Sequence, residues 1–313
     1  MHLSTRNTVS ENTARELALL SLEKVKFHYN GIYNEILNDV SLTLQQGSSF
    51  CIAAPNGTGK TTFLKICAGE VKPTNGTVQI YGQSSSSWKS HKYFGYAPQN
   101  LAFPSMLTVR ECIRTIAAYR DSSINEWLHL VNRFQLSEIL DSQVLHLSGG
   151  YQRRVAILLS FIGTPHLLLL DEPLSGVDIE SKTVILSALS EFQHNGGSII
   201  WTTHDLRDLD MIEANLIILN RGIIAFNDNP RRLIRDYQQL VIETSYADMI
   251  SAVPHTLCMN NGNKTIFFVD KYLSLDNAIT ALKEQQQNLT ISTRTMSFDE
   301  AYLLYLRLLK KEQ

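Results

Sequence analysis

Apolar and polar residues follow one another along much of the chain in patterns that predict strands. The alternation over 19–29 indicates a half-buried strand, and apolar pieces on either side of Gly47 indicate two more. A further short strand is predicted at 77–82. Continuous apolar runs are typical of strands buried on both faces of a parallel sheet. Such runs occupy 166–173, 197–204 and 214–220.

Helical periodicity appears between the predicted strands. Thr108 and Glu111 have the T-x-x-E spacing of a capping box, which marks the start of a helix. Because strands and helices alternate, we predict an α/β fold with a mainly parallel sheet. The segments with a helical pattern are 61–70, 105–120 and 125–136.

A change of composition near Tyr237 suggests where one domain ends and another begins. The length of 313 residues also favours about two domains. We predict a flexible extension at 1–16, a main domain at 17–236 and a small α+β domain at 237–313. In the last of these, strands are predicted at 239–244, 264–270 and 289–295, and helices at 246–253, 274–287 and 297–311.

Composition narrows the class of protein. The chain is 44% hydrophobic and 19% charged, so it can bury a core. A formal net charge of -2 argues against a nucleic-acid partner, which usually requires a basic bias. The four cysteines lie far apart, which favours reduced thiols in a cytosolic protein. The most apolar stretch, 156–170, is interrupted by 163–166, so we expect no membrane span.

The segment CIAAPNGTGKTT, at 51–62, lies where a predicted strand passes into a predicted helix. It matches the phosphate-loop pattern G-x-x-x-x-G-K-[ST] except that Ala54 replaces the first glycine. Backbone N–H groups of such a turn and the helix N-terminus attract anions. Lys60 would contact the β- and γ-phosphates, and the Thr61 hydroxyl would reach Mg²⁺. The predicted loop residues are Ala54, Pro55, Asn56, Gly57, Thr58, Gly59, Lys60, Thr61 and Thr62.

Two later segments also carry candidate chemistry. In LSGGYQRRV, Ser148, Gly149 and Gly150 open a helix whose free amides could bind an anion, although an ordinary glycine turn has the same pattern. In LLLLDEP, Asp171 suits Mg²⁺ ligation and Glu172 suits orienting and deprotonating a water. An acid pair at a helix N-terminus is the alternative interpretation of these two residues.

Taken together, these segments resemble the nucleotide-binding domain of ABC transporters, from about Leu17 to Tyr237. The resemblance implies a P-loop NTPase fold of ABC type with a helical subdomain at about 100–150. Ala54, Tyr151 and Val177 depart from the family pattern, but none of them removes a charge or a hydroxyl from the chemistry. In addition to the loop, the matching residues are Tyr29 for the aromatic that stacks on adenine, Gln99 for the Q-loop, Ser148, Gly149 and Gly150 for the signature, Asp171 and Glu172 for Walker B, 175–178 for the D-loop and His204 for the switch.

The family mechanism is carried over to this chain by the resemblance. It implies an ATPase that holds ATP and Mg²⁺ between the loop of one chain and the signature of another. One copy of each motif leads us to expect a homodimer. Glu172 is the implied general base, and His204 would hold the γ-phosphate and orient the water. Thr61, Gln99 and Asp171 are the implied metal contacts.

The resemblance also implies transport through a separate membrane permease, with this chain on the cytoplasmic face of the membrane. Residues 293–311 resemble the ending of ATPases that serve ABC-2 type exporters, which suggests export. We expect Leu101, Phe103 and Met106 to form an apolar patch for a permease helix, unless they are buried in the helical subdomain.

Two other functions fit parts of the sequence. A soluble ABC-type ATPase acting on ribosomes or DNA is the main alternative, but the chain has a single cassette, no long coiled-coil insertion and a slightly acidic charge. A regulator that binds nucleotide without turnover is disfavoured because Glu172 and His204 are both present.

Overall fold

The structure is a computed structural model of the chain, which divides into two compact units, Met1–Asp228 and Asn229–Gln313. The predicted extension at 1–16, the loop residue Asn56, Leu101, the predicted helix at 246–253 and nearly all of the one at 274–287 lie outside the described residues. The structure describes residues 18–29, 31, 35–55, 57–100, 103–104, 106–205, 208–209, 211–236, 240–244, 257–261, 264–269, 280 and 291–311.

The first unit contains an antiparallel sheet that the sequence patterns did not predict as a separate layer. Its strand order is β2-β1-β4-β5. Buried side chains alternate with more exposed ones along β2, because one face of the sheet packs on the core and the other faces solvent. The strands are β1 (Leu20–Phe27), β2 (Leu37–Leu44), β4 (Asn75–Ile80) and β5 (Gln83–Ser84).

A second, six-stranded sheet has the order β10-β9-β3-β8-β7-β6. All neighbours in it are parallel except β10, which runs antiparallel to β9, so the predicted mainly parallel sheet is confirmed. The four leucines of β7 are fully buried, as expected for an interior parallel strand. The predicted strands are β3 (Phe50–Ala53), β7 (Leu167–Leu170), β8 (Ser198–Thr203) and β9 (Asn215–Asn220). Two strands were not predicted, β6 (Phe94–Ala97) and β10 (Ile223–Asp228).

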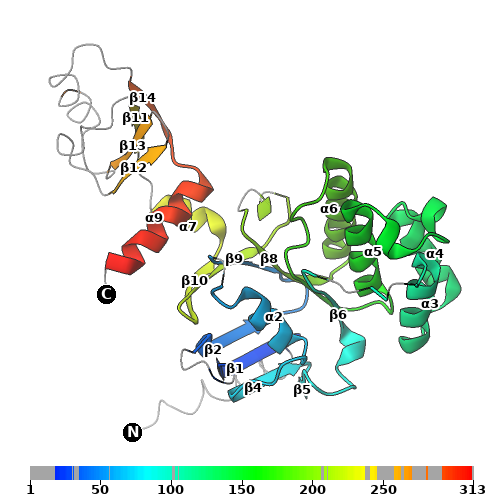
Figure 1. The fold of residues 1–313 in the computed structure, drawn as a ribbon. Coiled ribbons are helices and arrows are strands. Elements are labelled where there is room, and N and C mark those ends of the chain that lie inside the picture. The colour runs from blue at the N-terminus through cyan, green and yellow to red at the C-terminus, as the bar shows by residue number, and fades with distance from the viewer. Residues whose placement is uncertain are drawn as a thin grey trace, which may run out of the picture. The chain divides into compact units, whose positions relative to one another are not determined.

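Helices pack around these sheets in two places. Helix α2 lies between the two sheets, whereas α3, α4, α5 and α6 gather at one end of the unit (Figure 1). The predicted capping box of α3 is confirmed, because Thr108 Oγ1 accepts from Glu111 N–H at 3.2 Å and Glu111 Oε2 accepts from Thr108 N–H at 2.9 Å. The helices are α2 (Lys60–Cys67), α3 (Val109–Tyr119), α4 (Ile124–Arg133), α5 (Gly149–Phe161) and α6 (Ile179–His194), with short 3₁₀ turns η1 (His91–Tyr93), η2 (Ser137–Ile139) and η3 (Val144–His146).

The main core of the first unit lies between the sheets and around α2. Phe63, Leu64 and Ile66 of α2 are fully buried and pack with side chains of both sheets. Burying a side chain of this size stabilises the fold by about 1.5–3 kcal/mol. This packing fixes the N-terminus of α2 at the carboxyl end of β3, where ligands bind in sheets of this kind.

The second unit is a small antiparallel sheet with two described helices. The sheet order is β12-β13-β11-β14, and α7 packs against α9 through buried residues that include Leu233 and Leu304. Because α7 belongs to this unit, the unit begins at residue 229, eight residues before the predicted boundary at 237. The predicted elements are β11 (Leu240–Thr244), β13 (Lys264–Val269), β14 (Ile291–Thr295) and α9 (Phe298–Lys311). Two elements were not predicted, α7 (Pro230–Asp236) and β12 (Leu257–Asn261).

No helix in the described part of the chain combines the length and the apolar character that crossing a lipid bilayer requires.

Candidate functional site

The glycine loop connects β3 to α2 and leaves the N-terminus of the helix open. Gly57 and Gly59 have φ angles of +78° and +104°, a backbone conformation that favours glycine. A Cβ atom at Gly59 would lie 2.8 Å from Ile36 Cγ2, so a larger residue would also clash. No acidic side chain occupies the first turn of α2, which leaves its N–H groups and dipole available to an anion.

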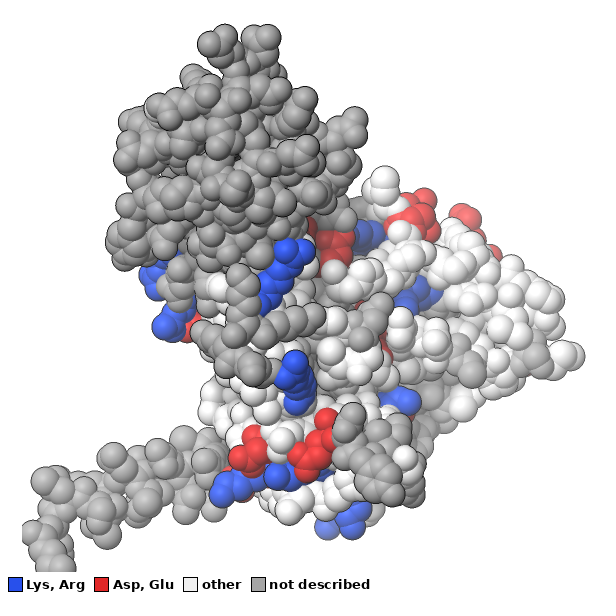
Figure 2. Space-filling model, turned by 60° about the vertical axis from the view of Figure 1, so that its left-hand side comes forward, with Lys and Arg blue, Asp and Glu red and all other residues white. Residues whose placement is uncertain are grey.

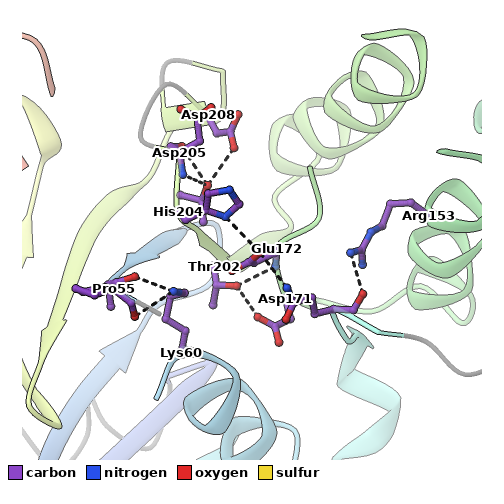
Figure 3. Close-up of polar contacts among 12 residues, drawn as sticks. Pro55, Lys60, Arg153, Asp171, Glu172, Thr202, His204, Asp205 and Asp208 are labelled. Carbon is purple, nitrogen blue, oxygen red and sulfur yellow. Dashed lines mark hydrogen bonds and ion pairs between the residues drawn. The ribbon is translucent and has the colours of Figure 1, made fainter. Parts of the chain in front are cut away.

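Lys60 is held over this loop. Its Nζ donates to the carbonyl oxygens of Ala54 at 2.7 Å and Pro55 at 3.4 Å, and the residue is 6% exposed (Figure 3). Burial lowers the pKa of Lys60, while the charges of Glu172 and Asp171 act in the opposite direction. The loop therefore presents a buried amine that an added anion would favour in its charged form.

Ala54 occupies the loop without backbone strain. The residue is 3% exposed and packs in the main core, and it is absent from the described non-glycine residues that have positive φ. The glycine of the usual pattern is therefore not needed for backbone conformation here. The alanine methyl adds buried apolar surface instead.

Asp171 and Glu172 follow β7 and are both tied to Thr202 of β8. Thr202 Oγ1 donates to Asp171 Oδ1 at 2.6 Å and accepts from the Glu172 N–H at 2.8 Å (Figure 3). Asp171 is 1% exposed, and its Oδ2 has no hydrogen-bond partner in the described part of the chain. Thr202 was not among the predicted site residues, because its only local signal is its place two residues before His204.

Gln99 and His204 both reach the carboxylate of Glu172. Gln99 Nε2 donates to Glu172 Oε2 at 3.1 Å, and His204 Nδ1 lies 3.3 Å from the same oxygen. Glu172 is nearly buried and has a φ of +47°, which costs a non-glycine residue about 1–3 kcal/mol and is common at functional sites. Gln99, Glu172 and His204, which were predicted from three separate segments of the sequence, thus meet at one oxygen atom.

The turn after β8 presents His204 to this carboxylate. Thr203 Oγ1 accepts from Asp205 N–H at 2.9 Å and contacts Asp208 Oδ2 at 3.1 Å (Figure 3). Lys182 of α6 forms an ion pair with Asp208 at 2.6 Å, which anchors the turn to the helix. The His204 side chain itself is 55% exposed, so it can meet a ligand from solvent.

The signature residues lie apart from the loop. Ser148 caps α5, and its Oγ accepts from the Tyr151 N–H at 3.4 Å. A Cβ atom at Gly150 would come within 2.1 Å of Asp178 Oδ2, so α5 needs glycine there to pack on the start of α6. Within the described ranges, no hydrogen bond or ion pair joins Ser148, Gly149 or Gly150 to Lys60, Asp171 or Glu172.

Arg153 of α5 is a second residue that sequence analysis missed. Its two terminal nitrogens donate to the carbonyl oxygens of Pro98 at 3.1 Å and Gln99 at 2.9 Å, so it fixes the backbone that carries Gln99. A cleft of about 270 Å³ lies between this backbone, the start of α5 and the turn at 175–177. Phe103 lines it and is 9% exposed, whereas Met106 is 74% exposed. The expectation of one exposed apolar patch is therefore wrong for Phe103, which packs inward.

Tyr29 lies beside the N-terminal turn of α2. Its hydroxyl is 3.2 Å from Thr62 Oγ1, and its ring packs edge-on against Phe27 with centroids 4.8 Å apart. The residue remains 39% exposed, so ring surface is available to a planar group bound near the loop.

The residues present suit a magnesium ion bound together with phosphates. Asp171 Oδ2 is a buried carboxylate oxygen without a partner among the described residues, and Thr61 supplies a hydroxyl at the start of α2. In the same part of the chain no group of three or more His, Cys, Asp or Glu residues could hold a metal alone. Mg²⁺ typically takes one or two protein ligands and completes its shell with water and substrate phosphates.

Comparison with known proteins agrees with this geometry. Residues 37–175 match the family described as ABC transporter. The glucosylceramide transporter ABCA12 of Mus musculus is 32% identical over 221 residues, which are 68% of this chain but only 8% of that protein. The spermidine/putrescine import ATP-binding protein PotA of Haemophilus influenzae is 28% identical, over 74% of this chain and 63% of that protein. The chain thus spans only part of these relatives.

Solved structures share the fold. A structure of the ATP binding subunit of an ABC transporter is 25% identical, with a TM-score of 0.64, and the match covers 70% of this chain and 93% of that one. The dimeric structure of a bacterial ABC transporter cassette has a TM-score of 0.61 and 23% identity, covering 67% of this chain and 98% of that one. The chain belongs to the ABC ATPase family, and its predicted P-loop NTPase fold of ABC type is confirmed.

Proposed function

We propose that the chain binds ATP with Mg²⁺ and hydrolyses it to ADP and phosphate. The observation that carries the proposal is the convergence of Gln99 and His204 on Glu172 Oε2, beside the buried Asp171. Both contacts of the Glu172 carboxylate are made by Oε2, and in the described part of the chain Oε1 has no hydrogen-bond partner, so it is available to accept a proton from water. Lys60 and the open end of α2 supply the charge that phosphates need.

Hydrolysis would be an in-line displacement at the γ-phosphorus. The water oxygen bonds to phosphorus, the bond to the bridging oxygen of ADP breaks, and Glu172 accepts the proton of the water. General base catalysis of this kind typically contributes about 10²–10⁴-fold. Lys60 would exchange the carbonyls of Ala54 and Pro55 for phosphate oxygens, and His204 would contact the γ-phosphate. Positioning and charge stabilisation supply most of the rate.

Asp171, Thr61 and Gln99 would hold the Mg²⁺ that accompanies ATP. When bound, this ion would supply positive charge that offsets the negative charge of the phosphates. Asp171 offers Oδ2, which has no partner among the described residues. Gln99 donates to Glu172 through Nε2 and keeps its carbonyl oxygen as a ligand. Tyr29 would stack on the adenine, and Thr62 keeps the Tyr29 ring in place through its hydroxyl contact.

A second copy of the chain would complete the site. Ser148, Gly149 and Gly150 make no recorded polar contact with Lys60, Asp171 or Glu172 in the described part of the chain. Head-to-tail pairing would bring the signature of one chain to the nucleotide held by the other. The ATP-bound pair would then be favoured by contacts that only the nucleotide provides.

We infer that hydrolysis energises transport through a membrane permease. This inference is supported by family membership and by relatives whose names include a transporter and an import ATP-binding protein. Export is favoured by the resemblance of 293–311 to the ending of ABC-2 type ATPases. Attachment to a permease would place the chain on the cytoplasmic face of the membrane.

The alternative, an ABC-type ATPase that acts on ribosomes or DNA, receives little support from charge. On the face shown in Figure 2, acidic and basic side chains are interspersed and do not form one basic stretch. Binding to nucleic acid usually depends on clustered lysines and arginines that displace counterions.

Substitution of Glu172 tests the proposal directly. Glu172→Gln removes the proton acceptor but keeps the shape of the side chain, so ATP affinity should stay within threefold while turnover falls about 10²–10⁴-fold. The variant should accumulate an ATP-bound dimer in size-exclusion chromatography with light scattering. Glu138→Gln, at an exposed position outside the site, is the matched control and should behave as the unsubstituted chain. Turnover at the normal rate in Glu172→Gln would show that Glu172 is not the base.

A further inference from the structure

A second cavity of about 470 Å³ lies on the first unit and shares no lining residue with the site described above. It is bounded by β5, the segment 88–92, the C-terminal end of α3 and the turn at Gly163. Cavities that hold drug-sized or cofactor-sized ligands are about 300–1,000 Å³, so this one is large enough for a nucleotide-sized molecule.

Arg120 is a fixed cation in the wall of this cavity. Its Nη1 donates to the Phe94 carbonyl oxygen at 2.8 Å, and the other guanidinium donors have no recorded partner in the described residues. Gly163 has a φ of +83°, and a Cβ atom there would lie 2.9 Å from Arg120 Cβ and Cδ. The glycine thus makes room for the arginine stem. Burial lowers the pKa of Arg120, yet arginine stays charged at neutral pH.

Two lysines add charge beside Arg120. Lys89 and Lys92 are exposed and line the cavity, and in the described part of the chain neither forms an ion pair. Lys92 Nζ lies 4.8 Å from the centre of the Tyr93 ring. Among the described residues that line the cavity, Asp121 is the one carboxylate, so Lys89, Lys92 and Arg120 leave an excess of two positive charges. A phosphate monoester, whose charge is close to -2 at neutral pH, matches that excess.

Two aromatic side chains line the same cavity and remain exposed. Trp88 is 76% exposed and Tyr119 is 66% exposed. Neither ring pairs with another aromatic ring among the described residues, although the Tyr119 hydroxyl contacts His91 Nδ1 at 3.4 Å. Single exposed aromatics are ordinary, but two beside three cations provide surfaces on which a planar ring can stack. Stacking of a base on an aromatic residue contributes about 1–3 kcal/mol.

We propose that this cavity binds a small phosphorylated molecule that carries a planar ring. The phosphate would take Lys89, Lys92 and the unused donors of Arg120, and the ring would stack on Trp88 or Tyr119. Such a ligand would be distinct from the ATP of the loop, because none of these residues belongs to the hydrolytic site. A phospholipid phosphate offers the same charge without the ring, so the two sources can be separated by experiment.

Flavin mononucleotide is a suitable probe because it combines a planar ring with a phosphate monoester and has no triphosphate for the loop. Isothermal titration should show that it binds at least tenfold more tightly than riboflavin, which lacks the phosphate, and than ribose 5-phosphate, which lacks the ring. Equal affinities for flavin mononucleotide and riboflavin, or no binding at millimolar concentration, would overturn the proposal.

Substitutions of the lining residues test whether flavin mononucleotide binds in this cavity. The double variant Lys89→Gln, Lys92→Gln and the single variant Trp88→Ala should each weaken flavin mononucleotide at least tenfold, whereas Trp88→Phe keeps a ring and should lose less. Arg114→Gln changes an exposed cation of α3 that does not line the cavity and should leave affinity unchanged. Affinity that does not change in the double variant and in Trp88→Ala would show that the probe binds elsewhere.

Two further measurements separate this site from the alternatives. All of these variants should keep the ATP turnover of the unsubstituted chain, since they lie outside the hydrolytic site. Loss of turnover in step with flavin affinity would mean that the probe reports on the ATP site and would defeat the proposal. Sedimentation with phosphatidylglycerol vesicles that depends on Lys89 and Lys92, without binding of flavin mononucleotide, would assign the cavity to a membrane surface instead.

Discussion

The hydroxyl of Thr202 joins the two acidic residues of the site, and its removal has consequences that can be estimated. Thr202→Val keeps the shape of the side chain but leaves Asp171 Oδ1 and the Glu172 N–H without their partner. The residues that carry these groups are nearly buried, with Asp171 1% and Glu172 9% exposed. An unsatisfied buried group costs about 1–3 kcal/mol, and more when it is charged, so the variant should lose about 2–5 kcal/mol of stability.

Two assays measure this effect, thermal melting of the nucleotide-free chain and steady-state ATP turnover. For a unit of about 200 residues each kcal/mol shifts Tm by about 2–4 °C, so Thr202→Val should melt about 4–20 °C lower. Turnover should fall about 10–100-fold, because Glu172 loses the bond that fixes its backbone and small displacements of a catalytic group are costly. Thr202→Ser keeps the hydroxyl and should lose only about 1 kcal/mol for its missing methyl.

The matched control is Thr183→Val at an exposed position of α6, where the threonine hydroxyl, within the described residues, bonds only to the Ile179 carbonyl oxygen of its own helix. It should change neither Tm nor turnover appreciably. If Thr202→Val and Thr202→Ser had the same Tm and the same turnover, the bridging hydroxyl would have no role in placing Asp171 and Glu172, contrary to this prediction.

Two other predictions follow from the loop and the core. Ala54→Gly should change ATP affinity, measured by titration calorimetry, less than threefold, because Ala54 has no positive φ that glycine would relieve. It should lower the free energy of unfolding by about 1 kcal/mol, because the alanine methyl is buried. A hundredfold gain in ATP affinity would contradict this prediction. Burial raises the pKa of the Cys51 and Cys67 thiols, with the charge of Asp208 adding to the effect at Cys51, so the folded chain keeps these protons above about pH 8.5 while the unfolded chain releases them. Stability measured by urea titration should therefore be fully present below about pH 8.5 and fall above it by about 1 kcal/mol per pH unit per thiol, and Cys67→Ala should reduce that slope.

Local signals were enough to predict much of the fold. The strands of the six-stranded sheet other than β6 and β10, the helix after the loop and the capping box of α3 were predicted from sequence, because hydrophobic period and cap chemistry depend on residues a few positions apart. The short β6 was missed, since Phe94–Ala97 has no clear alternation and becomes a strand by pairing with β7. The division of strands into two sheets was also missed, because partner choice is a long-range property.

The sequence determined which chemical groups this protein has and their order along the chain, since phosphate-loop glycines, a lysine, an acid pair and a histidine can be read from short segments. Only the tertiary structure decided which of them meet. Gln99 and Glu172 are 73 residues apart in the sequence, and Thr202 and Glu172 are 30 residues apart. Both contacts exist because β6, β7 and β8 lie side by side and end at one edge of the sheet. The cavity at Trp88 has the same origin, because it draws residues from β5, α3 and the turn at Gly163. Contacts between residues distant in sequence depend on how buried elements pack, and local patterns along a chain do not encode that packing.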